Sequence, residues 1–251
     1  MEQEFCTAVF WRGGEKIDLH GLEPEAVRYL SVTGERKVDV SFLQAYPNLE
    51  ELLLMEKCEG VEVLSELKQL RHLTLWLSAP VFWENIHLPK LRYLHLRGEK
   101  NGGVTPLLSG ITFLHLEEMR KIEDISPLLM PADHLQKLYL QSLPAVQTLP
   151  NLGQFQNLYA MKLYELHKLN DLTALSHSNL HFFAASLIAD KMSAGKLAES
   201  VMEIPRLKGA ALELVDRSRR RYGQIQKAFA AAGKSPLLCE EISDLRVWMS
   251  L

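Results

Sequence analysis

The chain has 251 residues, 47% of them hydrophobic, so it can bury a substantial core as one or two domains. Its 28 basic and 31 acidic residues give a formal net charge of −3, which offers no case for a nucleic-acid or anionic-membrane partner. The scattered, odd-numbered cysteines Cys6, Cys58 and Cys239 indicate reduced thiols. The sequence shows no signal-like start and no apolar run of about 20 residues, so we expect a soluble, cytoplasmic protein.

The first 26 residues predict a capping β-hairpin. Residues Phe5–Trp11 alternate weakly between apolar and polar side chains, Lys16–His20 alternate again, and Gly13 and Gly14 lie between the two stretches. Glycine tolerates the positive φ angles that tight hairpin turns require. We therefore assign residues 1–26 to an N-terminal capping hairpin.

From Val27 onward one pattern, L-x-x-L-x-L, recurs every 20–24 residues. A steady period of this length means that one structural unit is repeated and buries its apolar face against its neighbours. Val27/Leu30/Val32 forms a degenerate first copy. The clear copies are Leu49/Leu52/Leu54, Leu70/Leu73/Leu75, Leu91/Leu94/Leu96, Ile111/Leu114/Leu116, Leu135/Leu138/Leu140, Leu158/Met161/Leu163 and Leu180/Phe183/Ala185.

The pattern resembles the leucine-rich repeat, in its short class of about 22 residues. An outer turn of the form I-x-D-I/L-x-x-L supports this resemblance at Ile122–Leu128 and at Leu169–Leu175. The resemblance implies an α/β solenoid: a horseshoe with a parallel concave β-sheet, a convex side of 3₁₀ or extended chain, an N-terminal β-hairpin cap and a C-terminal helical cap. It covers Val27 to Ala185 and extends less regularly to Val215.

The pattern changes after Ala185. Ser193–Glu203 predicts a helix that begins at a serine, and Leu207/Ala210/Leu212 predicts a ninth strand. Arg217–Ala232 predicts a second helix that Gly233 terminates, and the apolar tail from Ile242 to Leu251 is expected to pack against the cap. We assign residues 27–215 to eight or nine repeats, the last atypical, and residues 216–251 to a C-terminal cap helix and tail.

The template also predicts which side chains point away from the core. Positions four and six face inward, so positions three, five and seven face outward from the concave sheet. These positions are rich in aromatic residues and histidine, which dominate the energetics of protein interfaces. The candidate protein-binding residues are Tyr29, Glu51, Met55, His72, Trp76, Tyr93, His95, Arg97, Phe113, His115, Glu117, Lys137, Tyr139, Lys162, Tyr164 and Phe182.

Two other interpretations of this face remain open. The rings can bury one another through cross-strand pairs, although we favour a binding surface, because a contiguous apolar patch usually marks a contact site. His95 and His115 share position five on neighbouring strands, with Glu117 near, and a metal site is conceivable. No cysteine or second carboxylate joins them, so we favour contacts to a partner, with some pH dependence, and assign no metal site.

Three other sequence features have simpler interpretations. The cluster Asp216–Arg221 can meet nucleic acid or an acidic protein surface, but a solvated helix face is favoured. Gly233–Ser235 matches a permissive phosphate-loop motif, yet it follows a helix where that loop must follow a strand, which favours a helix C-cap. Cys58 lies where the repeat places a buried small residue, which favours packing over catalysis.

These features predict a non-enzymatic protein–protein interaction module that grips one partner protein on its concave face and needs no cofactor. A cytoplasmic inhibitor or immunity-type protein is one concrete form. The alternative is a scaffold or regulatory subunit of an enzyme complex that docks through the arginine-rich C-terminal helix. We disfavour nucleic acid, expect no membrane contact and favour a monomer, since fold alone does not choose a function.

Overall fold

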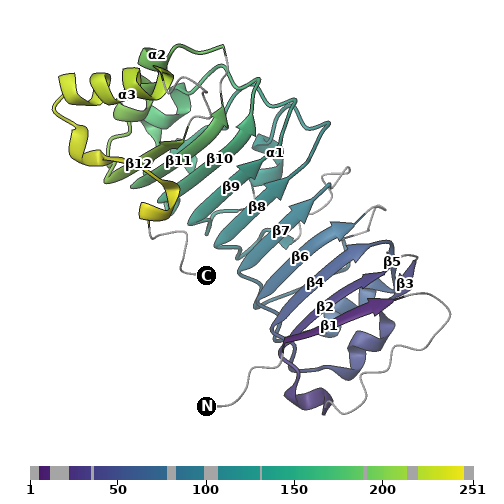
Figure 1. The fold of residues 1–251 in the computed structure, drawn as a ribbon. Coiled ribbons are helices and arrows are strands. Elements are labelled where there is room, and N and C mark those ends of the chain that lie inside the picture. The colour runs from purple at the N-terminus through teal and green to yellow at the C-terminus, as the bar shows by residue number, and fades with distance from the viewer. Residues whose placement is uncertain are drawn as a thin grey trace. The chain divides into compact units, whose positions relative to one another are not determined.

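The computed structural model describes residues 6–11, 23–34, 37–77, 83–98, 107–130, 132–188, 191–213 and 220–245. The chain forms two compact units, Met1–Leu114 and His115–Leu251 (Figure 1). The boundary falls inside strand β8 (Phe113–Glu117). Within the described ranges, no helix is long and apolar enough to cross a membrane.

The first unit is built from parallel strands that follow one another in chain order. They are β1 (Cys6–Trp11), β2 (Tyr29–Gly34), β4 (Glu51–Glu56), β6 (His72–Leu77) and β7 (Tyr93–Arg97), with a small second sheet of β3 (Val38–Asp39) and β5 (Cys58–Glu59). The returns carry the short 3₁₀ helices η1 (Pro24–Ala26), η2 (Ser41–Ala45) and η3 (Val61–Glu66).

The register of these strands follows the leucine template. Glu51 pairs with Tyr29 on one side and with His72 on the other, so template position three aligns across the sheet. Positions four and six, such as Leu73 and Leu75, are at most 2% exposed. Burying these leucines is the main favourable term in the fold, and each repeat supplies a similar set.

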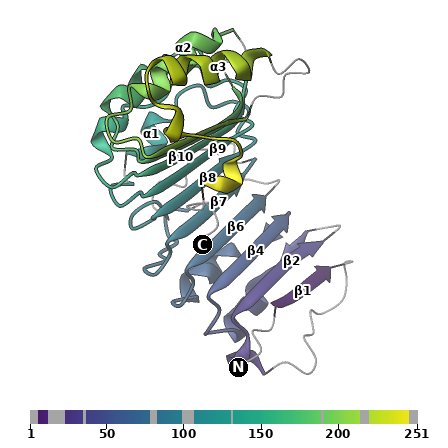
Figure 2. The same ribbon diagram turned by 60° about the vertical axis from the view of Figure 1, so that its left-hand side comes forward.

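The second unit repeats the arrangement and ends in helices. Its elements after β8 are α1 (Ser126–Leu129), β9 (Lys137–Gln141), η5 (Leu152–Gln154), β10 (Ala160–Leu166), η6 (Thr173–His177), β11 (Phe182–Ile188), α2 (Ala194–Met202), β12 (Gly209–Glu213), α3 (Arg220–Ala231), η7 (Ser235–Leu237), β13 (Leu238–Cys239) and η8 (Ile242–Asp244). Strands β9 to β13 pair in parallel, and Figure 2 shows α2 and α3 side by side next to the last strands.

The predicted C-terminal elements are confirmed. The Ser193 hydroxyl accepts a hydrogen bond from the Lys196 backbone N–H (3.2 Å) and so caps α2. The predicted ninth strand is β12. Helix α3 ends at Ala231, Gly233 follows with a φ of +68°, and the Lys234 N–H donates to the Phe229 carbonyl at 2.8 Å. This Schellman turn confirms the C-cap interpretation of the Gly-Lys-Ser sequence.

The predicted N-terminal hairpin lies only in part within the described residues. Strand β1 pairs in parallel with β2, from Cys6 opposite Tyr29 to Trp11 opposite Gly34, and so continues the register of the repeats by one strand. The expected turn and the returning stretch Lys16–His20 lie outside the described residues. The domain boundaries at residues 26 and 215 remain predictions.

Strands in both units end in a left-handed residue at template position eight. The backbone φ is positive at Glu56 and Gly98 in the first unit and at Glu118, Ser142, Glu165 and Leu187 in the second, between +51° and +73°. Only glycine adopts this conformation without a steric penalty. The repeats therefore leave the sheet through one sharp turn, which the leucine pattern does not predict.

Candidate functional site

All sixteen predicted site residues lie on strands, at the outward template positions. None of them is fully exposed: His95, His115, Glu117 and Lys137 are each 8% exposed, and the others are half-buried. These side chains are therefore partly buried on the sheet, and their role in binding a partner stays a prediction. Neighbouring rings cover one another, because outward side chains on adjacent parallel strands lie within contact distance.

In the first unit the rings meet edge to face. The His72 and Tyr93 ring centroids are 5.5 Å apart at 62°, and those of Tyr93 and Phe113 are 4.9 Å apart at 83°. The His72 Nδ1 atom lies 3.1 Å from the Glu51 carboxylate. Edge-to-face packing is the geometry that the aromatic quadrupole favours, so position three forms a preassembled aromatic row.

A second group in the first unit centres on Trp76. The His95 ring meets its indole edge to face, with centroids 6.1 Å apart, and the Arg97 guanidinium lies 4.7 Å from the centroid of the Trp76 ring. The buried Trp76 Nε1 has no hydrogen-bond acceptor among the described residues. A cation over an indole face is attractive, so Arg97 holds the indole in place.

His95 does not provide the pH dependence near neutrality that the sequence suggested for the histidines. Its burial, and then the nearby charge of Arg97, lower its pKa to about 4. The imidazole is therefore neutral at physiological pH, because desolvation penalises the charged form.

In the second unit the corresponding side chains stack in a different geometry. The His115 and Tyr139 rings are nearly parallel, with centroids 4.0 Å apart and an interplanar angle of 12°. The Lys162 ammonium lies 4.3 Å from the Tyr139 centroid. Burial raises the pKa of Tyr139, with smaller contributions from Glu117, Tyr164 and Glu165, so its phenol stays protonated.

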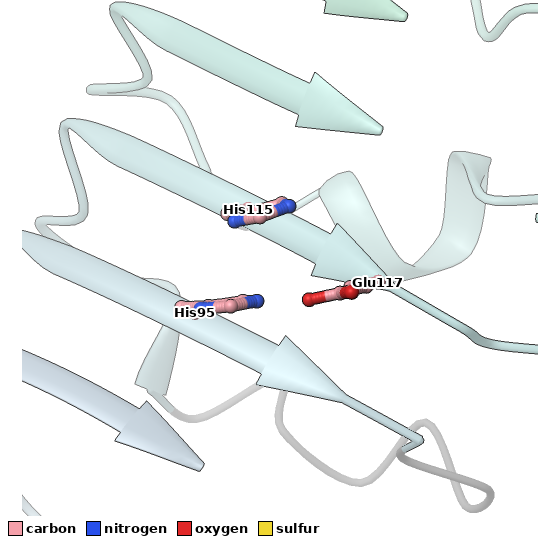
Figure 3. Close-up of side chains that lie close together, drawn as sticks. All are labelled: His95, His115 and Glu117. Carbon is pink, nitrogen blue, oxygen red and sulfur yellow. The ribbon is translucent and has the colours of Figure 1, made fainter. Parts of the chain in front are cut away.

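A side-chain amide links two of the buried groups of the second unit. The Gln141 Nε2 donates to Glu117 (3.0 Å), and the Gln141 Oε1 lies 3.3 Å from His115 Nε2. With the amide oriented this way, His115 Nε2 carries the proton. Figure 3 shows His115 and Glu117 rising from the same strand, β8, and His95 from β7.

Burial lowers the pKa of the Lys162 ammonium, and Glu213 opposes this shift. Burial also lowers the pKa of Lys137. Both ammonium groups are partly desolvated on the strands β9 and β10. A partner carboxylate that approaches them gains a stronger electrostatic interaction than it would at a fully hydrated lysine.

The last predicted residue, Phe182, leaves the aromatic rows and joins a different cluster. It packs against Ala184, Ala211 and Leu245. Leu245 belongs to the C-terminal tail, which the sequence expectation placed in the cap without a defined contact. The sequence signal for this contact is the alanine at position five of β11 and β12, together with the glycine at position three of β12.

The arginine-rich cluster is described only from Arg220. Arg221 donates to the backbone carbonyls of Met192 (3.0 Å) and Ile188 (3.5 Å). These hydrogen bonds connect α3 to the end of β11 and to the segment before α2. Arg220 is exposed. The stretch from Asp216 to Arg219 lies outside the described residues.

Cys58 has no features of a reactive thiol. Burial, together with the charge of Glu56, raises its pKa to about 11, and its Sγ lies 3.8 Å from the Met55 carbonyl oxygen. The thiol is therefore protonated and poorly nucleophilic at neutral pH.

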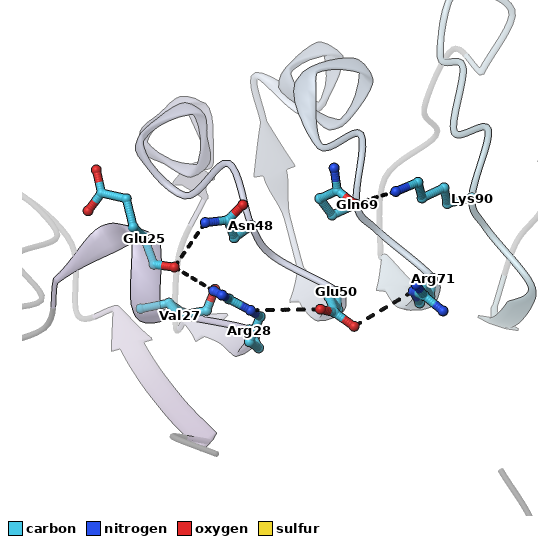
Figure 4. Close-up of polar contacts among 8 residues, drawn as sticks. All are labelled: Glu25, Val27, Arg28, Asn48, Glu50, Gln69, Arg71 and Lys90. Carbon is cyan, nitrogen blue, oxygen red and sulfur yellow. Dashed lines mark hydrogen bonds and ion pairs between the residues drawn. The ribbon is translucent and has the colours of Figure 1, made fainter. Parts of the chain in front are cut away.

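The outer edge of the first unit carries exposed ion pairs, in contrast to the partly buried contacts of the sheet face. Glu50 lies between Arg28 and Arg71, at 3.7 Å from each guanidinium Nε, and these side chains are around half exposed (Figure 4). Ion pairs of this exposure contribute about 0–1 kcal/mol each. This edge offers a matched, solvated surface for control substitutions.

Parallel strands with leucines at fixed inward positions, joined by short 3₁₀ returns, define the leucine-rich repeat fold. Neither a protein-family model nor a curated protein matches the sequence. The structure of this chain is similar to solved structures, one of which is TLR13. In the TLR13–ssRNA13 complex, the match has 20% identity and a TM-score of 0.55 and covers 75% of this chain and 32% of TLR13.

Two internalins from Listeria monocytogenes are also similar. InlF matches with 18% identity and a TM-score of 0.44 over 85% of this chain and 56% of InlF, and internalin C2 with 20% identity and a TM-score of 0.44 over 86% and 81%. The chain thus spans about half of InlF and a third of TLR13. At 20% identity and a TM-score of 0.55, the TLR13 match supports the fold alone.

Proposed function

We propose that the chain is a protein-binding module whose outward strand positions grip one partner protein. The observation that carries this proposal is the preassembly of the aromatic rows, with Trp76, Tyr93 and Tyr139 each held by ring or cation contacts. Side chains that are already ordered lose little further entropy on binding, and tryptophan, tyrosine and arginine are enriched among binding hot spots.

Charged groups among the rings favour a protein over an apolar ligand. Glu51 stands beside His72, Arg97 over Trp76, and Lys162 beside Tyr139. Mixed apolar and charged groups in one surface are typical of non-obligate protein interfaces. The net charge of −3 favours a protein partner over nucleic acid, whose phosphates require a basic surface.

A monomeric, non-enzymatic inhibitor or immunity-type protein of the cytoplasm is the specific form that we propose. Such a protein acts by occupying its partner, so it requires hot spots and no catalytic group. The alternative scaffold role, in which the arginine-rich helix docks an enzyme, loses support because Arg221 already serves the two carbonyls of its own chain.

A pull-down from native lysate tests this function. We expect the wild-type chain to capture one stoichiometric protein, and Trp76→Ala plus Tyr93→Ala to lose it. The matched control is Arg71→Ala plus Lys90→Ala, two exposed residues of the outer edge, which should retain the partner. Circular dichroism confirms that both variants fold. An unchanged partner profile in the aromatic variant would contradict the proposal.

A companion variant tests the second unit in the same assay. Tyr139→Ala plus Lys162→Ala removes the ring and the ammonium that contact one another on β9 and β10. We expect a loss of captured partner relative to the edge control. Retention of the partner by this variant restricts the binding surface to the first unit.

A further inference from the structure

The tail of the second unit folds back over the outward side of its last strands. Strand β13 pairs with β12 at Ala210 and Ala211, and the chain then turns through η8. We call Glu241–Leu245 the strap. Leu245 packs against Ala211 of β12 and Ala184 of β11, both at template position five, the position that carries candidate binding residues on earlier strands.

Small residues on β11 and β12 leave room for the Leu245 side chain. We call the space over Ala184, Gly209 and Ala211 the slot. Position five holds Tyr139 on β9 and Lys162 on β10 but alanine on β11 and β12. Position three of β12 is Gly209, and a Cβ atom there would lie 2.8 Å from the Leu245 Cδ2. The slot therefore fits one leucine, which is 4% exposed.

Other described contacts of the strap involve Ile242 and Glu213. The Ile242 N–H donates to the Glu213 carboxylate at 2.7 Å, and Ile242 is half-buried against the same cluster. Glu241, Ser243 and Asp244 are exposed, and the hydrogen bonds between them are internal to the strap. Among the residues that the structure describes, one buried leucine and one charge-assisted hydrogen bond are the main attachments of the strap, and an attachment of this size favours local opening.

The slot adjoins the proposed binding surface. Ala184, beneath Leu245, pairs across the sheet with Lys162. Glu213 links the two places, because it accepts the Ile242 hydrogen bond and also raises the pKa of Lys162 against the effect of burial. A protein that engages Lys162 and the neighbouring β11 thus meets the strap.

We propose that the strap is a built-in competitor, which occupies in cis a slot that otherwise accepts a short leucine-bearing turn of the partner protein. The chemistry of the occupant is defined by the strap itself: an aliphatic side chain for the slot and a backbone N–H for Glu213. The competition with a partner rests on the proposed function; the occupancy of the slot does not.

The slot is tested without any partner. The opened variant carries Leu245→Ser and Ile242→Ser in the full chain, and the probe is a fluorescein-labelled synthetic peptide with the sequence of residues 236–245, with serine in place of the cysteine. We expect the peptide to bind the opened variant at least about tenfold more tightly than wild type, whose tethered strap has an effective concentration near millimolar. Equal binding to both proteins, or no binding to a folded opened variant, overturns the slot.

Two controls separate the slot from general loosening. Adding Gly209→Ala to the opened variant places a Cβ 2.8 Å from the position of the leucine Cδ2 and should weaken peptide binding, whereas unchanged binding would contradict the slot. Cys239 reports on the closed strap, because it is partly buried against the same cluster. Its alkylation, followed by mass spectrometry, should be faster in Leu245→Ser than in wild type, and equal rates contradict a closed strap.

The captured partner tests competition. We expect it to bind the opened variant more tightly than wild type, because wild type must first release the strap. Equal affinities overturn the competition while the proposed function stands. Failure of wild type and opened variant to bind any partner overturns the proposed function, and the peptide result is independent of that outcome.

Discussion

The two units use the same inward template and present different outward surfaces. In the first, rings meet edge to face around Tyr93 and Trp76. In the second, His115 stacks flat on Tyr139 and is joined through Gln141 to a buried carboxylate. The first surface is thus chiefly apolar with charges at its margin, and the second is a hydrogen-bonded polar surface.

This difference separates the residues that build the repeat from those that recognise a partner. The template fixes positions one, four and six because these side chains must fill the core between successive turns. Positions three, five and seven do not fill this core, so their side chains differ in type from one strand to the next. We therefore expect substitutions at positions three, five and seven to affect partner binding most, and substitutions at positions one, four and six to affect stability most.

The largest expected effect concerns the fixed positions. Leu73→Ala in the first unit and Leu140→Ala in the second each leave a cavity at a site that is fully buried. Each should lower the free energy of unfolding by about 2–5 kcal/mol. Denaturant unfolding measures both. A loss below about 1 kcal/mol in either unit would contradict the equivalence of the two cores.

The next effect concerns His95 and pH. Its folded-state pKa, about 4, lies below the ordinary value of 6.5, so below pH 6.5 the unfolded state binds the proton first. Stability is then complete above pH 6.5 and falls as the pH drops toward 4, by on the order of 3 kcal/mol. Urea unfolding at pH 7 and pH 4.5 should show a shallower decline in His95→Gln. An identical pH dependence in the two proteins would refute a buried neutral imidazole.

The amide bridge of the second unit should have a smaller effect. Gln141→Ala removes the donor to Glu117 and leaves a carboxylate that is 8% exposed without this hydrogen bond. We expect a loss of about 1–3 kcal/mol in unfolding free energy. Gln156→Ala is a matched control, since its amide hydrogen-bonds from an exposed position. Equal losses in the two variants would mean that the bridge does not contribute.

The smallest effect is expected at template position eight. Gly98 and Glu56 adopt the same left-handed conformation at template position eight, two repeats apart, and a Cβ on Gly98 would meet no atom within 4 Å. Gly98→Ala should cost about 1 kcal/mol and Glu56→Gly should gain a similar amount, because only the backbone penalty changes. Thermal unfolding measures both. Shifts of the same sign would show that side-chain contacts outweigh the backbone term.

Sequence reasoning predicted the repeat from leucine spacing alone, because burial at fixed intervals leaves one register in which the strands can pair. It also predicted α2 from a serine cap and the end of α3 from Gly233. Both helix ends could be predicted because each is determined by a few residues that are close together in the sequence.

The outward surface was predicted only in part. The template position of His95, Glu117 and Lys137 predicted that their side chains face outward. It did not predict that they are buried, because burial depends on the sizes of neighbouring side chains. The strap joins residues separated along the chain, Leu245 and Ala184, and no local pattern specifies such a pair. The left-handed turns at position eight involve glutamate, serine and leucine as well as glycine. The first three residue types rarely adopt a positive φ, so the sequence does not predict these turns.

The central claim, that the variable positions bind the partner, is tested most directly by the affinity of the captured protein for three chains. These are the wild type, Trp76→Ala plus Tyr93→Ala, and the edge variant Arg71→Ala plus Lys90→Ala. The account predicts an increase in Kd of about 30-fold or more for the aromatic variant and a change of less than about threefold for the edge variant, by titration calorimetry. Unchanged affinity in the folded aromatic variant, or a larger loss in the edge variant, would contradict it.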